Sequence, residues 1–232
     1  MIRLYVEAGL VAGAAVAATQ GQAHYVGSVM RRPVGDIVRL FNGRDGEWAC
    51  RIAALSRGKA TFAVETLVGP QAADSDLWLA FALLKRDSTD LVVQKATELG
   101  VSALLPVVTE RTNTGRTNPD RLRAIAVEAA EQSERLTVPD IHPPQALDDF
   151  LAAWPAGRTL FVAAERAEAR WPEPVSDPAG LLIGPEGGFG PRDHLLLDRR
   201  CFVRRVSLGR RILRAETAAI AGLALLQVPR CG

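Results

Sequence analysis

The sequence has few of the residues that bind metal ions or form disulfide bonds. Among its 232 residues there are only three cysteines and three histidines. The cysteines are Cys50, Cys201 and Cys231. They are far apart, odd in number and without a Cys-x-x-Cys pair, which argues against a disulfide framework and against a zinc site. We therefore expect no metal ion in this protein.

Long hydrophobic runs are also missing. No apolar stretch reaches the roughly 18 residues that indicate a membrane-spanning helix. Residues 1–22 are rich in alanine and valine, but Glu7 interrupts them and no basic segment precedes an apolar core, as it would in a signal peptide. We expect this stretch to belong to the fold and the protein to act in the cytoplasm, away from membranes.

The net charge of +2 is too small to indicate nucleic-acid binding, but its distribution is uneven. Residues 1–70 hold 8 basic and 5 acidic residues (net +3), residues 71–180 hold 11 and 17 (net −6), and residues 181–232 hold 9 and 4 (net +5). The basic ends would form a footprint for a polyanion if the fold brought them to one face. The other interpretation is that these charges lie on separate solvated faces.

The first 70 residues predict a small β domain. Residues 37–41 and 47–52 alternate between apolar and polar on either side of Asn42-Gly43, which is a strong hairpin signal. Residues 61–68 predict a further strand, and short antiparallel strands of this kind close into a small barrel or sheet. Residues 69–76 have the composition of a linker, so we place a domain boundary between residues 72 and 73.

From residue 77 onwards, apolar strands alternate with helical patterns. The predicted strands are residues 77–84, 103–108, 159–164, 180–183 and 202–207. The predicted helices are residues 90–99, 119–136, 191–199 and 213–227. This alternation predicts an α/β domain with a mostly parallel sheet and helices on both faces.

Two glycine-containing loops follow predicted strands near the end of the chain. The first spans residues 184–190 (GPEGGFG) and the second residues 208–218 (LGRRILRAETA). Glycine lets a ligand approach bare peptide groups. Two such loops could therefore hold a nucleoside cofactor through main-chain N–H and C=O groups. An ordinary tight turn is the other interpretation of the first loop.

The residues of the loops limit the kinds of ligand that they could bind. The first loop matches neither the dinucleotide-binding GxGxxG pattern nor a P-loop, so an oxidoreductase is the weakest hypothesis. Glu186 would repel a phosphate but not a cation such as the sulfonium of S-adenosylmethionine. In the second loop, Arg211 and Arg214 flank the start of a predicted helix, where positive charge is unfavourable. A partner such as RNA phosphate, a base edge or a glutamate would offset that cost.

These loops resemble the small-subunit ribosomal RNA methyltransferase E family, the uridine-N3 methyltransferases of the knotted SPOUT class. Three further segments agree with that family: HYVGSVMR at residues 24–31, QKATELGV at residues 94–101 and EAAEQSER at residues 128–135. The matches extend over nearly the whole chain, and their order and spacing are specific together.

The resemblance implies a PUA-like RNA-binding β-barrel over residues 1–72 and a SPOUT-type methyltransferase domain over residues 73–232. In the second domain a trefoil knot would hold S-adenosyl-L-methionine. By position in the motifs, the cofactor-binding residues would be Leu182, Ile183, Gly184, Gly188, Leu208, Gly209, Ile212 and Leu213. The family acts as a homodimer, and the apolar last helix agrees with burial in the core or against a partner subunit.

The implied reaction methylates N3 of a uridine in small-subunit ribosomal RNA, with free RNA or the assembled subunit as substrate. Because N3 carries a proton, the site needs a base and a group that stabilises charge on the neighbouring oxygens. The candidates are Glu186, Arg211, Arg214 and Glu216, among which the sequence assigns no roles. An ion pair between Arg214 and either glutamate is the structural alternative.

Two other functions fit the same features. A knotted ribose 2′-O-methyltransferase would share the cofactor loops and differ in the product. A non-catalytic RNA-binding protein of ribosome assembly would bind RNA without the cofactor, and the two intact loops argue against it.

In the N-terminal domain, the resemblance implies that Arg3, His24, Arg31 and Arg32 face RNA. His24 would equally suit a partly buried turn.

The chain departs from the family at two positions. Ser88 stands where a basic residue is usual, and Glu134 stands where glycine is usual. Each removes or opposes positive charge near the expected RNA face, which weakens the RNA contacts of the middle segment but not the cofactor site.

Overall fold

The computed structural model describes residues 1–72, 74–112, 117–163 and 178–227. They form two compact units, Met1–Ala73 with Ala130–Val138 and Asp74–Ala129 with Pro139–Gly232. The grouping of Ala130–Val138 with the first unit was not predicted, because its pattern continues that of the helix before it. Ala164, at the end of a predicted strand, and Cys231 lie outside the described residues.

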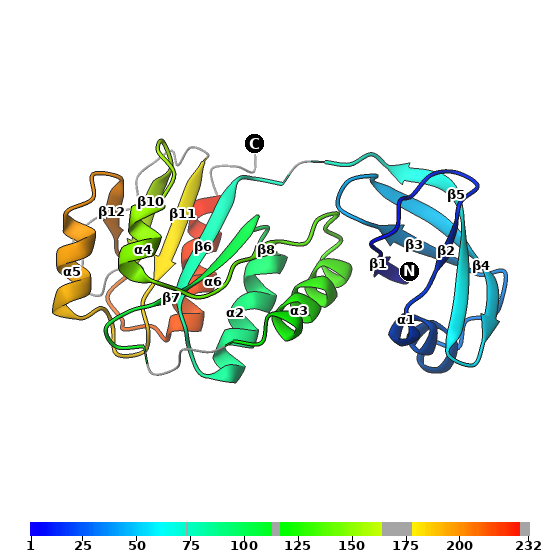
Figure 1. Ribbon diagram of the computed structural model, residues 1–232, viewed down its shortest axis with the longest axis horizontal. Helices are drawn as coiled ribbons and strands as arrows, with labels where there is room; N and C mark the ends of the chain where they lie inside the picture. The colour runs from blue at the N-terminus through cyan, green and yellow to red at the C-terminus, as the bar shows by residue number, and fades with distance from the viewer. Residues whose placement is uncertain (73, 113–116, 164–177, 228–232) are drawn as a thin grey trace. The chain divides into compact units, whose positions relative to one another are not determined.

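The first unit is built on a five-stranded sheet in the order β1-β3-β4-β5-β2 (Figure 1). Its elements are β1 (Arg3–Tyr5), β2 (Ala15–Ala17), α1 (Gln20–His24), a π-helical turn (Tyr25–Val29), β3 (Ile37–Phe41), β4 (Glu47–Ser56) and β5 (Lys59–Gly69). Strand β1 pairs parallel with β3, and the other pairs are antiparallel. The predicted hairpin and third strand are confirmed, whereas β1 and β2, with three residues each, were too short to predict.

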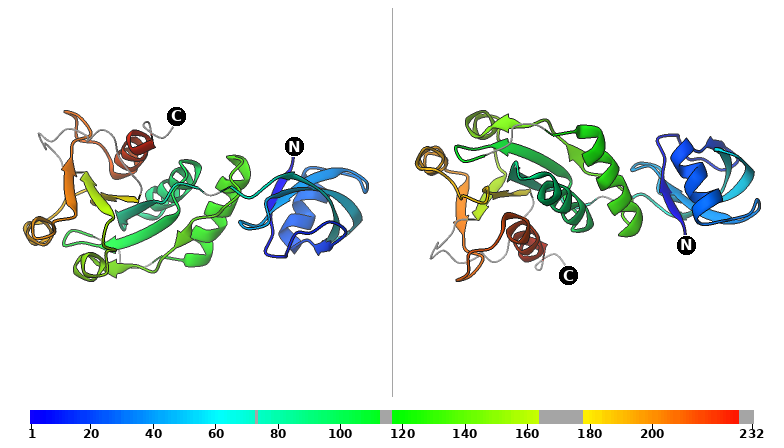
Figure 2. Two further views of the ribbon diagram at one scale, coloured as in Figure 1. Left: turned by 90° about the horizontal axis from the view of Figure 1, so that it is seen from above. Right: turned by 90° about the horizontal axis from the view of Figure 1, so that it is seen from below.

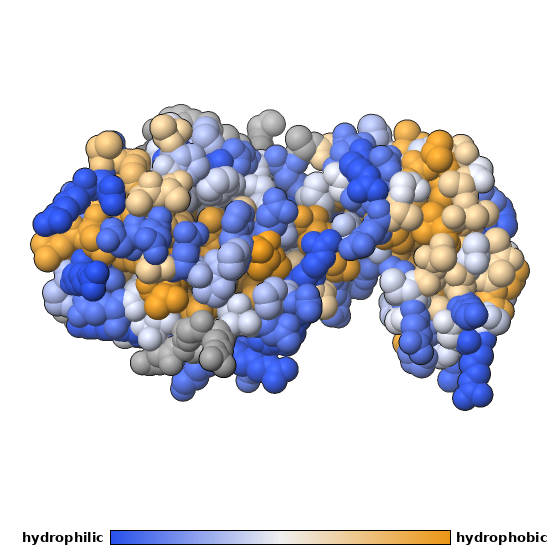
Figure 3. All heavy atoms as spheres, in the orientation of Figure 1, coloured by the Kyte–Doolittle hydropathy of each residue, from blue (hydrophilic) through white to orange (hydrophobic). Residues whose placement is uncertain are grey.

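Alternate residues of these strands form the core of the first unit. Val38 and Leu40 on β3, Ile52 on β4, and Phe62 and Val64 on β5 are at most 2% exposed. The alternation follows from the two-residue period of a strand, which sends every second side chain to the same face. On the face drawn in Figure 3, hydrophobic residues also reach the surface of this unit, and Leu67 and Val68 of β5 are exposed.

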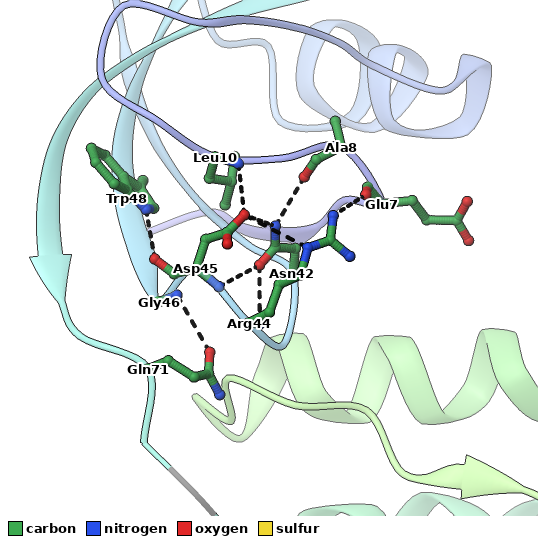
Figure 4. A network of polar contacts seen from close by, with 9 residues as sticks. All are labelled: Glu7, Ala8, Leu10, Asn42, Arg44, Asp45, Gly46, Trp48 and Gln71. Carbon is green, nitrogen blue, oxygen red and sulfur yellow. Dashed lines mark hydrogen bonds and ion pairs between the residues drawn. The ribbon is translucent and has the colours of Figure 1, made fainter.

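A network of side-chain to main-chain hydrogen bonds fixes the β3–β4 hairpin (Figure 4). The amide oxygen of Asn42 accepts from the main-chain N–H groups of Arg44 (3.1 Å) and Asp45 (2.9 Å). Its amide nitrogen donates to the carbonyl oxygen of Ala8 (2.9 Å) and to the carboxylate of Asp45 (2.6 Å). The same carboxylate accepts from the N–H of Leu10 at 2.9 Å. The turn thereby holds the preceding loop against the sheet.

These bonds also set the acidity of Asp45. The N–H of Leu10, followed by the amide of Asn42, stabilises the charged carboxylate and lowers its pKa below the ordinary value. A carboxyl whose folded-state pKa is lowered stabilises the fold above its unfolded-state pKa, and that contribution is lost as the pH falls through the folded-state pKa.

We therefore expect Asp45→Asn to lower the free energy of unfolding at pH 7. The difference from wild type should shrink as the pH falls below about 4, the pKa of the carboxyl in the unfolded chain, toward the lower pKa of the folded protein. Urea unfolding of both proteins at pH 7 and pH 3 measures this. An equal difference at the two pH values would contradict the assignment.

The second unit contains an all-parallel sheet in the order β12-β10-β11-β6-β7-β8, with β9 also paired to β7 (Figure 1). Its strands are β6 (Leu77–Ala82), β7 (Ala103–Val108), β8 (Asp140–Ile141), β9 (Gln145–Ala146), β10 (Thr159–Ala163), β11 (Ala179–Ile183) and β12 (Val203–Val206). The helices are α2 (Arg86–Glu98), α3 (Pro119–Gln132), α4 (Leu147–Ala152), α5 (Pro191–Asp198) and α6 (Ala215–Gln227). The last three residues of α3, from Ala130, belong to the first unit. The predicted α/β class with a parallel sheet is confirmed.

Helices on both faces explain why the central strands are apolar throughout. Helices α2 and α6 lie on one face of the sheet, and α4 and α5 lie on the other (Figure 2). All five residues of β11 are buried, as expected for a parallel strand covered on both faces. Helix α6 comes close to this strand at Gly222, where a Cβ atom would lie 2.7 Å from Leu181. The chain after the edge strand β12 therefore returns beneath the middle of the sheet.

Three predicted helix boundaries were wrong. Helix α2 begins at Arg86 rather than at residue 90, and α6 begins at Ala215 rather than at residue 213. Helix α3 ends at Gln132 rather than near residue 136, because Glu134 adopts a left-handed conformation with φ +61°. Helix α4 was missed, since six residues are too few for a periodic pattern.

The conformation of Glu134 gives a backbone reason for glycine at this position, separate from charge. A left-handed conformation costs a non-glycine residue about 1–2 kcal/mol. We expect Glu134→Gly to raise the free energy of unfolding by about 0.5–1 kcal/mol, after the greater flexibility of the unfolded glycine chain is subtracted.

Glu128→Gly is the matched control, because Glu128 is exposed within α3. There the same substitution should destabilise by about 1 kcal/mol. Chemical denaturation measures both variants, and destabilisation by Glu134→Gly would contradict the explanation.

Candidate functional site

A cavity of about 380 Å³ lies at the carboxyl ends of the parallel strands of the second unit. It is bounded by the ends of β10 and β11 at Ala163 and Ile183, by Arg205 of β12, and by Arg111, which follows β7. In the sheet, β7 and β8 lie on one side of β6, whereas the later strands β11, β10 and β12 lie on its other side. Ligands of α/β proteins bind at the carboxyl edge where the strand order reverses in this way.

The first glycine loop forms one wall of the cavity, and each of residues 183–189 lines it. The N–H of Gly188 donates to the carbonyl oxygen of Pro185 at 2.9 Å, closing a tight turn. The ring of Phe189 is buried under this turn, and a Cβ atom at Gly184 would lie 3.1 Å from it. The loop therefore presents peptide groups, rather than side chains, to much of the cavity.

The carboxylate of Asp193 joins this loop to the segment after β7. Asp193 is 2% exposed and accepts hydrogen bonds from the N–H of Gly190 (2.9 Å) and the N–H of Glu110 (3.1 Å). The carboxylate of Glu110 in turn accepts from the N–H of Arg192 at 3.0 Å. Because the two loops are 83 residues apart in the chain, these bonds fix two sides of one cavity.

Arg111 is held across the same junction. Its guanidinium donates to the carbonyl oxygen of Gly187 at 2.7 Å, and a Cβ atom at Gly187 would lie 3.6 Å from the Arg111 side chain. This arginine therefore lies at the mouth of the cavity with one of its nitrogen atoms already engaged.

The second glycine loop forms the opposite side, between β12 and α6. Gly209 has φ +107°, a conformation that side-chain-bearing residues rarely adopt, and its N–H donates to the hydroxyl of Ser207 at 3.3 Å. Leu213, Ala215 and Ala218 line the cavity from this side.

The structure brings together part of the predicted cofactor set. Four of those residues line the cavity: Ile183, Gly184, Gly188 and Leu213. Leu182 is fully buried in the core beneath it, while Leu208, Gly209 and Ile212 belong to the neighbouring loop without lining the cavity. Ile212 is 64% exposed.

Only part of the predicted catalytic set lines the cavity as well. Glu186 lines the cavity, whereas Arg211, Arg214 and Glu216 do not. Within the described parts of the chain, no ion pair joins Arg214 to either glutamate. Arg211 and Arg214 are exposed at the start of α6.

Sequence reasoning missed four cavity residues with chemically distinctive side chains. They are Arg111, Phe189, His194 and Arg205. Phe189 lay within the first loop but was not singled out. The other three carry no motif, since only the fold brings the segment after β7, the helix α5 and the strand β12 to one place.

Arg3 has a structural role in the first unit, which argues against the predicted RNA contact. Its side chain is 8% exposed and forms an ion pair with Glu47 at 2.6 Å. Its guanidinium donates to the carbonyl oxygens of Ala130 (3.0 Å), Glu131 (2.9 Å) and Arg135 (2.9 Å), and lies 4.6 Å from the centre of the Phe41 ring. Arg3 thus caps the last turn of α3 and is not available to a ligand.

The other three residues predicted to face RNA are exposed. His24 ends α1 and is not the partly buried turn residue that was the alternative, and Arg31 and Arg32 follow the π-helical turn. Arg31 has φ +50°, and Arg32 pairs with Asp36 at 3.5 Å. Non-glycine residues in this backbone region cluster at functional sites.

Among residues 1–72, 74–112, 117–163 and 178–227, no group of three or more His, Cys, Asp or Glu side chains could hold a metal ion. No helix in these same ranges is long and apolar enough to cross a membrane.

Comparison with known proteins assigns both parts of the chain to one class. Residues 71–227 match the RNA methyltransferase domain family, and residues 19–65 match the RNA methyltransferase PUA domain family. The class that the fold and the cavity define is therefore that of the RNA methyltransferases.

Individual relatives agree along the full length. The ribosomal RNA small subunit methyltransferase E of Rickettsia conorii is 32% identical, with 97% of this chain and 95% of that protein covered. The enzyme of the same name from Neisseria gonorrhoeae, solved with S-adenosyl methionine bound, has a TM-score of 0.86 at 27% identity, with 98% and 97% covered. A Legionella pneumophila protein described as a methyltransferase, also solved with this cofactor, has a TM-score of 0.88 at 29% identity, with 97% and 96% covered. The chain belongs to the ribosomal RNA small subunit methyltransferase E family.

Proposed function

We propose that this protein transfers a methyl group from S-adenosyl-L-methionine to small-subunit (16S) ribosomal RNA, and that the acceptor is N3 of a uridine. The observation that carries the proposal is the cavity of about 380 Å³ beside the two glycine loops. Membership of the family connects this cavity with RNA methylation. The relatives named above supply the substrate class.

The cavity fits the cofactor in size and chemistry. Its volume of about 380 Å³ lies within the range of small-molecule sites. Peptide groups of the loops suit the polar edge of an adenine and the ribose hydroxyls, and Leu213, Ala215 and Ala218 offer apolar surface for the rings. When bound, the cofactor supplies an electrophilic methyl group on a positively charged sulfur.

The chain's own residues would prepare the acceptor nitrogen. Glu186 is exposed on the cavity wall and is the acidic side chain placed to take the N3 proton, because no other carboxylate lines the cavity in the described chain. Arg111, fixed by Gly187, would stabilise negative charge on the flanking carbonyl oxygens. Arg211 and Arg214 would contact the RNA backbone outside the cavity, and Glu216 would orient the first turn of α6.

In the first unit, RNA would contact the exposed segment that includes His24, Arg31 and Arg32. The apolar side chains of Val29 and Met30 are also exposed there. Cationic groups beside apolar surface suit the phosphates and stacked bases of RNA. We propose that this unit is the PUA-like barrel of the family.

The trefoil knot and the homodimer are further parts of the proposal. The return of α6 from β12 to Leu181 of β11 is the path that a threaded C-terminal segment would take. Ile212, which precedes α6, and Leu225, which lies on α6, are both exposed and would be covered by a second subunit. The rRNA substrate would place the enzyme in the cytoplasm.

The test is incubation of the purified protein with methyl-labelled S-adenosylmethionine and undermethylated small ribosomal subunits, followed by digestion and identification of the labelled nucleoside. Labelled 3-methyluridine is the expected product. A label on ribose would show 2′-O-methyltransfer instead, and RNA binding without cofactor binding or label would show a non-catalytic assembly protein.

Gly209→Val tests the loop within the same assay. At φ +107° a β-branched residue costs about 1–3 kcal/mol, so the loop should rearrange and methyl transfer should fall at least about a hundredfold. Gly157→Val is the matched control, because Gly157 also has positive φ, nothing within 4 Å of its Cβ position, and no part in the cavity. Equal activities of the two variants would show that the second loop is not part of the site.

A further inference from the structure

The cavity contains an arginine that is held in place and only partly engaged. The carboxylate of Asp198 accepts from Nε (3.1 Å) and Nη2 (2.7 Å) of Arg205. The third nitrogen, Nη1, lies 3.1 Å from Nδ1 of His194. Because a guanidinium has five N–H groups and only donates, Nδ1 of His194 accepts, and the ring carries its proton on Nε2.

This arrangement leaves donors for an anion. Three of the five N–H groups of Arg205 are used by Asp198 and His194, and the other two have no protein acceptor among the described residues. Both Arg205 and His194 line the cavity, and the Arg205 side chain is 29% exposed. Strand pairing places Arg205 beside Val162, one residue before the end of β10, so the guanidinium lies at the sheet edge where the cavity begins.

The charged side chains that line the cavity also come from different elements. Glu186 is on the first glycine loop, whereas Arg205 is on β12. Arg111, the other cationic side chain of the lining, already donates to the carbonyl oxygen of Gly187. A ligand with a cationic centre and a carboxylate would match a cavity that has both an acidic and a basic side chain, and S-adenosylmethionine has both.

We propose that Arg205, oriented by Asp198 and assisted by the Nε2–H of His194, binds the α-carboxylate of the methionine part of S-adenosylmethionine. The inference rests on the proposed function and names the contact that selects the amino-acid end of the cofactor. An arginine whose guanidinium is already held in one orientation loses little side-chain freedom when it binds a carboxylate.

A phosphate of the RNA is the other anion that Arg205 could bind. The carboxylate is favoured because Arg205 shares its cavity with Ile183, Gly184 and Leu213, the residues that would hold the rest of the cofactor. The exposed Arg211 and Arg214 are outside the cavity and suit phosphates better.

The test is isothermal titration of the full-length protein with S-adenosylmethionine and with decarboxylated S-adenosylmethionine, in which a hydrogen replaces the carboxylate. Wild type should bind the complete cofactor about ten- to a hundredfold more tightly, as expected for a charge-assisted hydrogen bond. Arg205→Met should lose that preference while binding the decarboxylated compound as wild type does.

Arg204→Met is the matched control, because Arg204 is the exposed neighbour on β12 and donates to the carbonyl oxygens of Cys201 and Val203. It should keep the full preference for the carboxylate. Equal losses for both compounds in Arg205→Met, or a loss of RNA affinity alone, would overturn the inference. If the wild-type protein binds neither compound, the proposed function is refuted, and the inference with it.

Discussion

The hydrogen bonds of the Asp193 carboxylate are the contact on which the candidate site depends. A buried carboxylate is costly unless its oxygen atoms are satisfied, and here main-chain N–H groups from two distant segments satisfy them. Asp193 is also in the first turn of α5, where the helix dipole favours negative charge. The same group therefore starts a helix, closes the first glycine loop and holds the segment after β7.

The chemistry of the cavity follows from that junction. With the loop fixed, Glu186 lies on the wall, and Gly187 holds Arg111 at the mouth. The parallel sheet supplies the other side, because the carboxyl ends of β10, β11 and β12 meet at one edge. A rigid sheet with ligand-binding loops at its edge is a common way to combine stability with function.

The sequence predicted the parts of this protein that depend on local pattern. The strand β6 could be predicted because a strand that is buried on both faces is apolar throughout. The turn after β3 could be predicted because hairpin geometry favours the dipeptide Asn-Gly. The two glycine loops were readable because bare peptide groups require glycine. Two-residue strands such as β8 and β9 leave no such mark.

The features that the sequence did not reveal depend on contacts that only the fold creates. The resemblance implied that Arg3 faces RNA, yet carbonyl oxygens at the end of α3 and just after it accept from its guanidinium, and its side chain is largely buried. The pairing of Arg205 with His194 joins a strand to a helix, and no spacing rule describes it. Glu134 was interpreted through its charge, whereas its backbone conformation accounts for the end of α3.

The most direct test of this account is the affinity of Asp193→Asn for S-adenosylmethionine, measured by calorimetry beside Asp149→Asn, an exposed acidic residue in the first turn of α4. The amide is nearly isosteric, but its NH₂ group cannot accept from the N–H groups of Gly190 and Glu110. The account predicts a cooperatively folded Asp193→Asn protein with cofactor affinity at least about tenfold weaker, and wild-type affinity in the control. Wild-type affinity in Asp193→Asn would contradict the claim that this junction organises the site.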